Sequence, residues 1–504
     1  MSFISSSFLI FFPVVTTIYF LLPHRYRWMF LLAASCVFYM AFIPYYILIL
    51  LVTITIDYYA GMQIEDSIGH KRKWWLVASI ISTCTVLAIF KYFNFFNTNF
   101  AVIAHLLDLR YPVNFINIIL PIGLSFHTFQ SLSYVIEVYR GKQKAERHFG
   151  IYSLYVMFYP QLVAGPIERP QNLLHQFYET HTADYDRITK GLKRMLWGFF
   201  KKVVIADNVS IYVNQAYGNP HAYSGLALFV ATFFFAIQIY CDFSGYSDIA
   251  IGSAGVMGFT LMENFKNPYF AESIADFWRR WHISLSTWFR DYVYIPLGGN
   301  RVTYWKWCRN IMITFLLSGL WHGASWTYVV WGAVHGAYFI CSNAFAKIKT
   351  KMFPQLVHSA SVFVAFFRHL FLFMLILLTW AFFRASTITD AYYIIIHSCI
   401  GILQLLQQSV AVLFGSHSLA ALTDTFHGVL NPVNKDAHTL DYFILFCSLV
   451  GVLFVAEVID SWRGLVITIS SWPAWVRYPL YIAAVMCIMN LGVTQEVPFI
   501  YFQF

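Results

Sequence analysis

Charged side chains are scarce in this sequence. Only 11% of its 504 residues are Asp, Glu, Lys or Arg, whereas an ordinary soluble domain contains roughly 25%. Hydrophobic residues make up 59% of the chain and aromatic residues 20%. A soluble protein could not hide so much apolar surface from water, but a lipid bilayer accommodates it. The composition therefore excludes a soluble globular protein and predicts a multi-pass membrane protein.

Several motifs of other protein classes are also missing. The eight cysteines are scattered and form no Cys-x-x-Cys pair, so the sequence predicts neither a disulfide framework nor a zinc knuckle. The chain lacks His-Glu-x-x-His, a P-loop and a G-x-S-x-G elbow. These absences argue against a zinc hydrolase, a nucleotide-driven transporter and a hydrolase fold, respectively. We predict no metal site and no bound cofactor.

The net charge of +9 comes from short basic clusters between apolar runs. This pattern is typical of topology signals, because loops that stay in the cytoplasm keep an excess of Lys and Arg, and we predict no nucleic-acid partner. The clusters at 24–27, 71–73 and 140–147 follow the first, third and fifth expected spans, when the apolar segment 28–56 is counted as two short spans. The N-terminus is therefore expected outside, in the periplasm. The first segment lacks a small-residue cleavage site and is expected to be a retained helix.

A membrane-spanning helix needs about 20 apolar residues, and the chain contains many uncharged segments of that order. We expect spans in Phe3–Leu22, Trp28–Ile56, Trp74–Phe90, Tyr111–Ile136, Phe149–Ile167, Ala222–Cys241, Ile311–Ala346, Leu370–Phe383, Tyr442–Ala456 and Tyr478–Gln495. The second of these segments is long enough for two short spans broken at Pro44. Re-entrant or in-plane helices are expected after Ile167, and a loop outside the bundle from Ser409 to Leu440. The prediction is one all-α membrane domain over residues 1–504.

The segment Glu272–Pro296 is too charged to span a membrane. Its aromatic and aliphatic residues recur at steps of three, four and one, which predicts one amphipathic helix. The opposite face carries Arg279, His282, Ser286 and Arg290. An anchoring helix at the membrane interface is one interpretation, in which His282 is only one member of a polar face. A role for His282 in a buried site is the other.

The uncharged segment Ile311–Ala346 is too long for one span. As a straight helix it would measure roughly 54 Å, against a hydrocarbon core of about 30 Å. Gly319 and Gly323 bracket Trp321 and His322, and permit either a helix break or the close approach of a ligand. His322 is either a hydrogen-bonded core histidine or a functional residue. Ser318, four residues earlier, can face His322 on a helix.

His335 and Asp242 are less specific candidates. On a continuous helix His335 would lie about 220° around from His322, so the two share a site only if the helix breaks. Asp242 and Asp248 lie between apolar runs in QIYCDFSGYSDIAIG (238–252). Such carboxylates can neutralise nearby arginines, line a polar cavity or bind a coupling cation, and pairing between helices is their commoner use.

Five long segments together resemble one family. They are PIGLSFHTFQSLSYVIEVYRG (121–141), PQLVAGPIERP (160–170), QIYCDFSGYSDIAIG (238–252), DFWRRWHISLSTWFRDYVYIPLGGNR (276–301) and SGLWHGASWTYVVWGAVHG (318–336). In this order they resemble the bacterial membrane-bound O-acyltransferases over nearly the whole chain, above all the branch of alginate O-acetyltransferase membrane subunits. The resemblance implies a ring of roughly 11–13 transmembrane helices, with re-entrant and in-plane helices, around a central funnel.

The resemblance also implies a function and a site. His322, of the Trp-His-Gly motif, corresponds to the family's catalytic histidine, and His282 to its second site position; Trp321, Arg279 and Arg280 belong to the same motifs. The expected reaction moves an acetyl group from a cytoplasmic thioester, acetyl-CoA or a similar donor, to hydroxyls of an exported polysaccharide such as alginate. We expect the bacterial inner membrane as location and a periplasmic acetyltransferase or export protein as partner.

The chain ends in FIYFQF, with Tyr501 near the terminus. An aromatic anchor at the membrane interface is one interpretation. The ending also resembles the tyrosine-bearing tails of the teichoic-acid D-alanylation branch, which suggests an acyl relay through the phenol. Two other functions stay open from the sequence. A flippase for a lipid-linked sugar would need a similar polar cavity, although we find no inverted repeat, and a scaffold would need neither histidine.

Overall fold

The computed structural model describes residues 1–116, 121–163, 165–352, 362–414, 419–430, 439–493 and 499–502. Within these ranges every regular element is a helix. The chain divides into two compact units, and each unit is built from separated stretches of the sequence. The first contains Met1–Gly198, Tyr246–Asn264 and Ser284–Tyr292, and the second contains Phe199–Gly245, Phe265–Ile283 and Val293–Phe504. The single domain predicted over residues 1–504 stays a prediction.

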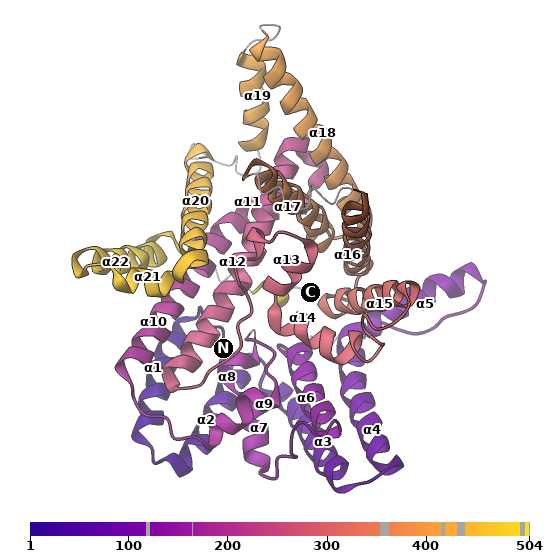
Figure 1. Ribbon diagram of the computed structural model, residues 1–504, viewed down its shortest axis with the longest axis vertical. Helices are drawn as coiled ribbons and strands as arrows, with labels where there is room; N and C mark the ends of the chain where they lie inside the picture. Colours follow the sequence, from indigo (N-terminus) through magenta and orange to yellow (C-terminus); the bar gives the residue numbers. More distant parts are fainter. Residues whose placement is uncertain are drawn as a thin grey trace. The chain divides into compact units, whose positions relative to one another are not determined.

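The first unit contains the N-terminal helices (Figure 1). Their apolar runs end where proline or polar residues interrupt them; at Pro44 the predicted interruption of the helix is confirmed, since α2 ends at Met40 and α3 begins at Ile47. The elements are α1 Ser6–Leu21, α2 His24–Met40, η1 Pro44–Tyr46, α3 Ile47–Asp66, α4 His70–Leu87, η2 Ala88–Tyr92, α5 Phe93–Leu106, α6 Leu124–Tyr139, α7 Phe149–Met157, α8 Tyr159–Leu162, α9 Pro170–Leu173, η3 Leu174–Tyr178, α10 Tyr185–Phe199 and most of α14, Ile283–Phe289.

The three N-terminal basic clusters come together within this unit. Arg72 donates hydrogen bonds to the carbonyl oxygens of Val138 and Tyr139 at the end of α6. Arg147 pairs with Glu65 and Asp66 at the end of α3, and the neighbouring His148 ring packs 4.6 Å from the Trp28 ring. These contacts bring the three clusters, or residues directly beside them, close to one another, and the predicted orientation in the membrane stays a prediction.

The second unit contains the remaining helices, with α12 starting in it and ending in the first. Its elements are η4 Phe200–Ala206, α11 Asp207–Gly218, η5 Pro220–Ala222, α12 Gly225–Met257, η6 Pro268–Phe270, α13 Ile274–Arg280, the end of η7 Arg290–Tyr294, α15 Tyr304–His322, α16 Trp326–Met352, α17 Val362–Arg384, α18 Ile388–Leu413, α19 Leu419–Leu430, α20 Thr439–Arg463, α21 Leu465–Ser471, α22 Ala474–Leu491 and η10 Ile500–Phe502.

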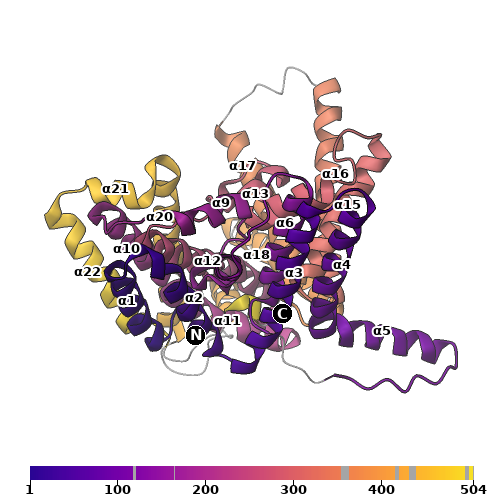
Figure 2. The same ribbon diagram turned by 90° about the horizontal axis from the view of Figure 1, so that it is seen from below.

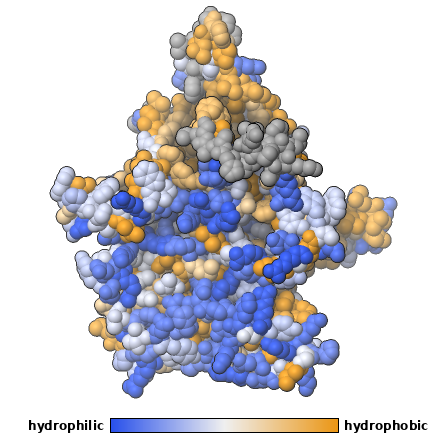
Figure 3. Space-filling view, viewed as in Figure 1, coloured by the Kyte–Doolittle hydropathy of each residue, from blue (hydrophilic) through white to orange (hydrophobic). Residues whose placement is uncertain are grey.

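Eight helices of the described part are long and apolar enough to cross a membrane. Their surfaces agree with that role: α18 exposes Ile400, Leu403, Leu406 and Val410, and Figure 3 shows hydrophobic surface over this helix. The chain is therefore an all-α polytopic membrane protein, as predicted. The predicted funnel and the count of roughly 11–13 spans stay predictions.

Three predicted segments fold differently. Residues 111–116 form no helix, and within the described part of the expected helix over Tyr111–Ile136 only α6 is helical. Pro112 and Pro121 lack the N–H that a helix interior needs. The Phe149–Ile167 segment breaks at Phe158 into α7 and α8, two residues before Pro160. The loop expected from Ser409 to Leu440 contains the end of α18 and all of α19, whereas its residues 415–418 and 431–438 lie outside the described part.

Candidate active site

His322 lies at a helix break in the second unit. α15 ends at His322, Gly323 is extended (φ −162°, ψ 152°), and α16 begins at Trp326. The predicted break in the long uncharged segment is thus confirmed. Gly323 is required there, because a Cβ atom would lie 2.1 Å from the Tyr328 ring. A helix end leaves backbone groups outside the regular hydrogen-bond ladder, and His322 and Gly323 are both buried at this one.

A second pair of glycines holds α15 and α16 together. A Cβ atom on Gly319 would lie 2.3 Å from the Tyr328 carbonyl oxygen, and one on Gly332 would lie 2.3 Å from the Phe315 carbonyl oxygen. Only glycine permits this backbone approach, so the two helices pack side by side (Figure 2). The predicted helix break falls at Gly323, whereas Gly319 serves a contact between two helices, a use that was not predicted.

His282 lies at a second break. The predicted continuous helix over Glu272–Pro296 is wrong: α13 ends at Arg280 and α14 begins at Ile283. His282 has a left-handed backbone (φ 42°), which is uncommon for a residue other than glycine and clusters at functional sites. Trp281 and His282 are consecutive and both fully buried. Of the two interpretations, the burial of His282 favours a buried site over membership of the polar face of an interface helix.

The two histidines and the C-terminal tyrosine meet around a small group of rings. The Tyr501 ring centroid lies 5.5 Å from that of His322 and 6.3 Å from that of His282. Trp321 lies 5.0 Å from His322 and 5.9 Å from His282. Phe243 of α12 lies 4.6 Å from His282 and 4.7 Å from Tyr501. Segments far apart in the sequence thus converge at the two helix breaks.

The surroundings of this group are apolar. Phe383 of α17 and Trp331 of α16 lie 5.3 Å and 5.0 Å from the His322 ring. Burial lowers the pKa of His282 to about 3, so its imidazole is neutral at ordinary pH. Burial also raises the pKa of the Tyr501 phenol, and the nearby Asp242 carboxylate adds to the shift. Tyr501 is therefore a protonated phenol that needs a base before it can act as a nucleophile.

Not all predicted site residues join this group. Ser318 is buried one turn before His322 on α15. Arg279 and Arg280 instead form ion pairs with Asp276 on their own helix, and the Arg279 side chain is 72% exposed. Their contacts are those of a surface helix turn and offer no direct role at the rings.

His335 occupies a separate aromatic pocket. It lies in the middle of α16, where its ring packs 4.8 Å from Trp331 and 5.0 Å from Trp278. Because Trp331 also packs on His322, one indole contacts both histidines. The helix break that was predicted as the condition for a shared site is present, yet His335 remains among aromatic side chains.

Asp242 has a partner that sequence reasoning missed. The Nζ atom of Lys202 lies 2.6 Å from Oδ1 of Asp242 and 2.7 Å from Oδ1 of Asp207. All three side chains are at most 4% exposed. Burial raises the pKa of Asp207, whereas the Lys202 ammonium lowers it. An arginine partner is therefore wrong for Asp242; Asp248 does pair with an arginine, Arg194. The available signal was the Lys201–Lys202 pair inside the apolar run WGFFKKVVIA (197–206).

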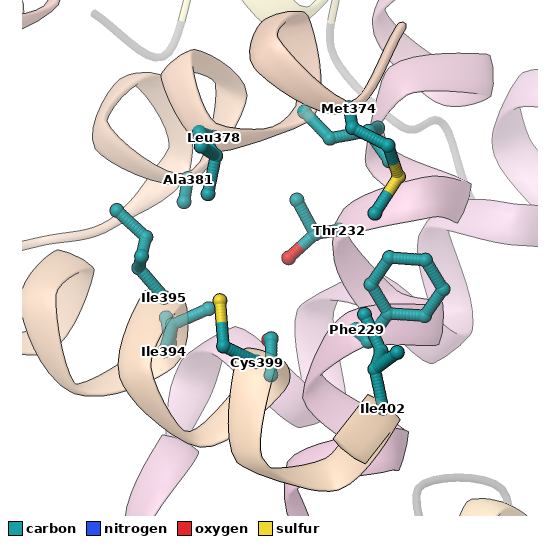
Figure 4. A pocket seen from close by; sticks show the side chains of 11 residues that line it. Phe229, Thr232, Met374, Leu378, Ala381, Ile394, Ile395, Cys399 and Ile402 are labelled. Atoms are coloured by element: carbon teal, nitrogen blue, oxygen red, sulfur yellow. The ribbon is translucent and has the colours of Figure 1, made fainter. Parts of the chain in front are cut away.

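An apolar cavity of about 130 Å³ lies elsewhere in the second unit (Figure 4). It is bounded by α12, α17 and α18, with Phe229, Leu378 and Ile394 among its lining residues. Ala381 of α17 faces this cavity, whereas Phe383 of the same helix packs on His322. The lining contains no histidine, carboxylate or amine, and its polar side chains are Thr232, Ser398 and Cys399. It shares no lining residue with the histidine group described above.

Comparison with known proteins identifies the family to which this chain is similar. The model of the membrane-bound O-acyltransferase family matches residues 16–379. A protein named probable alginate O-acetylase from Azotobacter vinelandii is 38% identical over 396 residues, which cover 78% of this chain and 77% of the relative. A peptidoglycan O-acetyltransferase from Helicobacter pylori is 33% identical over 72% of this chain and 71% of the relative. A teichoic acid D-alanyltransferase from Bacillus subtilis is 30% identical over 47% of this chain and 62% of the relative.

Proposed function

This chain belongs to the membrane-bound O-acyltransferase family, and from that premise we propose that His322, His282 and Tyr501 form its acyl-transfer site. Acyltransferase activity follows from the family and its relatives. One observation carries the assignment of the site: Tyr501, from the end of the chain, packs against His322 at the break between α15 and α16. Family membership also favours an enzyme over the flippase and the scaffold.

His322 acts as the general base. It removes the proton from an attacking hydroxyl while the hydroxyl oxygen forms a bond to the thioester carbonyl carbon. The C–S bond then breaks, and the thiolate takes the proton back from the imidazolium. A positioned base of this kind contributes about 10² to 10⁴ in rate. The apolar rings around His322 exclude water, which protects the thioester from hydrolysis.

His282 acts as a neutral hydrogen-bond donor. Because burial lowers its pKa to about 3, it cannot serve as a cation at working pH. A neutral imidazole can still donate one N–H to the carbonyl oxygen, where negative charge develops during the attack. Its left-handed backbone at the α13–α14 break orients the ring toward Phe243 and Tyr501.

Tyr501 is the first acceptor in this proposal. His322 takes the phenol proton, the phenolate oxygen attacks the thioester, and the free thiol leaves behind an aryl ester on Tyr501. A hydroxyl of the final acceptor then attacks the ester carbonyl, and the phenol is restored with the proton of that hydroxyl. The high pKa of the buried phenol fits this sequence, because the phenol waits protonated until a base acts on it.

The donor, acceptor and direction complete the proposal. We assign acetyl-CoA as the cytoplasmic donor and hydroxyls of an exported polysaccharide, alginate among them, as acceptors reached through a periplasmic acetyltransferase partner. The relatives named as alginate and peptidoglycan O-acetylating proteins support this direction. The N-terminus is placed in the periplasm, and the bacterial inner membrane is the location.

The test is donor consumption by purified protein in nanodiscs with radiolabelled acetyl-CoA. We expect label on the protein or on an added glycan, and none in His322→Ala. Loss of donor in the wild type but equal loss in His322→Ala would reject His322 as the base. No consumption with periplasmic partners and glycans present would reject acetyl-CoA, and sugar movement without any acyl donor would restore the flippase.

A further inference from the structure

The C-terminal segment is held in the second unit by a buried charge. The Oδ2 atom of Asp242 accepts a hydrogen bond of 2.7 Å from the backbone N–H of Ile500. The other carboxylate oxygen, Oδ1, lies 2.6 Å from Nζ of Lys202. The two oxygens of one carboxylate thus serve different purposes: one faces an ammonium group and the other faces the chain end. This hydrogen bond joins the η10 turn to α12, which carries Asp242.

Burying the charges of Lys202 and Asp242 costs free energy that pairing and hydrogen bonding must offset. A buried charge is unfavourable unless it is paired and hydrogen-bonded, and the Lys202 and Asp242 side chains are only 1% and 4% exposed. With Asp207 also beside Lys202, two carboxyl groups share one ammonium. The Ile500 N–H supplies Asp242 with a further donor, and a hydrogen bond to an ionised acceptor is stronger than a neutral one. The chain end therefore completes a buried polar site.

A second contact fixes the other end of the same segment. Asn208, at the start of α11, donates a 2.8 Å hydrogen bond to the carbonyl oxygen of Leu491, the last residue of α22. Lys202 and Asn208 lie on the continuous stretch formed by η4 and α11. η4 is a π-helix, a rare element that occurs frequently at functional sites. The stretch therefore contacts the C-terminal segment where it leaves α22 and, through Asp242, where it reaches the histidines.

The hydrogen bond also sets the position of Tyr501. Phe499 and Ile500 are fully buried, and the Phe499 ring lies 5.6 Å from Phe243. Tyr501 follows directly after the anchored N–H and packs 4.7 Å from the same Phe243. With Ile500 bound to Asp242, the next side chain lies against His322 and His282.

We propose that Lys202 and Asp242 are positioning residues that latch the C-terminal segment, so that Tyr501 is presented to His322 for acyl transfer. This inference rests on the proposed function of Tyr501. Lys202 orients the Asp242 carboxylate, and Asp242 holds Ile500. The latch acts through the tail, and Lys202 and Asp242 have no direct chemical step in it.

Ile500→Pro tests the latch most directly. Proline removes the N–H that Asp242 accepts but leaves the Lys202–Asp242 pair intact, and it is tolerated at the first position of a helical turn. We expect kcat for acyl transfer from radiolabelled acetyl-CoA to fall roughly 10- to 100-fold, the loss of one charge-assisted hydrogen bond. The KM for acetyl-CoA should stay within about twofold, because the latch positions Tyr501 and has no part in binding the donor.

Three further variants separate the latch from general damage. Ile500→Ala keeps the N–H and loses only the side chain, so it should retain most of the activity. Asp242→Asn keeps an acceptor oxygen while Asp207 still neutralises Lys202, and we expect a loss of about tenfold. Tyr240→Phe removes another buried hydrogen bond of α12, that to Glu457, and should leave the rate unchanged.

The position of Tyr501 is measured without acyl chemistry by ¹⁹F NMR of full-length protein carrying 3-fluorotyrosine at residue 501. We expect the resonance of the packed ring in wild type and Tyr240→Phe, and a solvent-like resonance in Ile500→Pro and, in part, in Asp242→Asn. Packed resonances in both latch variants would overturn the latch. So would released resonances with wild-type rates. If the Tyr501 ring is released in Ile500→Pro but Tyr501→Phe transfers acetyl normally, Asp242 does anchor Ile500. In that case Tyr501 carries no acyl group, and the relay is rejected.

Discussion

Two buried histidine neighbourhoods of the second unit differ in their backbone more than in their side chains. His322 and His335 both lie among aromatic rings, and both contact the Trp331 indole. His335, however, is in the middle of α16, whereas His322 ends α15 beside an extended glycine. Only the His322 neighbourhood receives His282, from another break, and Tyr501, from the chain end. Burial and aromatic contact alone do not make a site; a helix break opens room for segments distant in sequence.

The largest effect on acyl transfer should come from replacing His322, with the same replacement at His335 as the matched control. We expect His322→Ala to lower acyl transfer about 10²- to 10⁴-fold, because the attacking hydroxyl loses its base. His335→Ala serves as the control at an equally buried position. Transfer of radiolabelled acetyl groups in nanodiscs is the measurement, with size-exclusion profiles to confirm folding. Equal losses in the two variants would remove the functional difference between the neighbourhoods.

Tyr501→Phe tests whether the chain end takes part in the chemistry. The variant keeps the ring contacts but lacks the oxygen that would carry the acyl group, so label on the protein and transfer to the acceptor should both fall to background. Mass spectrometry of the C-terminal peptide after brief exposure to donor locates the ester in wild type. Tyr338→Phe, at a tyrosine near His335, is the matched control. Normal transfer by Tyr501→Phe would leave the tail as an anchor only.

His282→Gln tests whether a buried, neutral His282 makes the stability of the folded protein depend on pH. In the folded protein His282 has a pKa of about 3, against an ordinary value near 6.5. Above pH 6.5 both folded and unfolded forms are neutral, and His282 contributes no pH dependence. As pH falls from 6.5 toward 3, only the unfolded form gains a proton, so the wild type loses stability. Between pH 6.5 and 5 this loss amounts to about 2 kcal/mol.

Thermal unfolding in detergent at pH 7.5, 6.5 and 5 measures this term. His282→Gln should show a smaller decrease in Tm between pH 6.5 and 5 than the wild type does. At pH 7.5 His282→Leu, which has no N–H donor, should transfer acetyl about 10²-fold more slowly because the developing oxyanion loses its hydrogen bond. Parallel pH profiles for the wild type and His282→Gln would show that His282 is not the buried neutral group described above.

The smallest effect is expected in the second neighbourhood. His335→Phe replaces one planar ring by another among Trp278, Trp331 and Phe315. A swap of similar volume in an apolar pocket changes the unfolding free energy by less than about 1.5 kcal/mol, and acyl transfer should stay near wild type. The Tm and the initial rate at saturating donor are the readouts. A loss of activity at unchanged Tm would show that His335 takes part in acyl transfer.

Part of the site was predictable because local pattern and length constrain it. An uncharged segment longer than a bilayer must break, and Gly323 marked where, so His322 was found at a helix end. His282 was singled out, but on a continuous helix. Its periodicity continued through the break at Trp281 and His282, because periodicity records which residues are apolar and not whether the backbone between them is helical.

The sequence by itself determined the membrane environment, the helical class, the resemblance to the family and the break beside His322, because each depends on composition, length or motif within one segment. The tertiary structure decided that Lys202 pairs with Asp242, that Asp242 holds Ile500 and that Tyr501 meets His322. These contacts join residues far apart along the chain. Pairing a buried charge depends on which groups the fold brings within a few ångströms, and no local pattern records that.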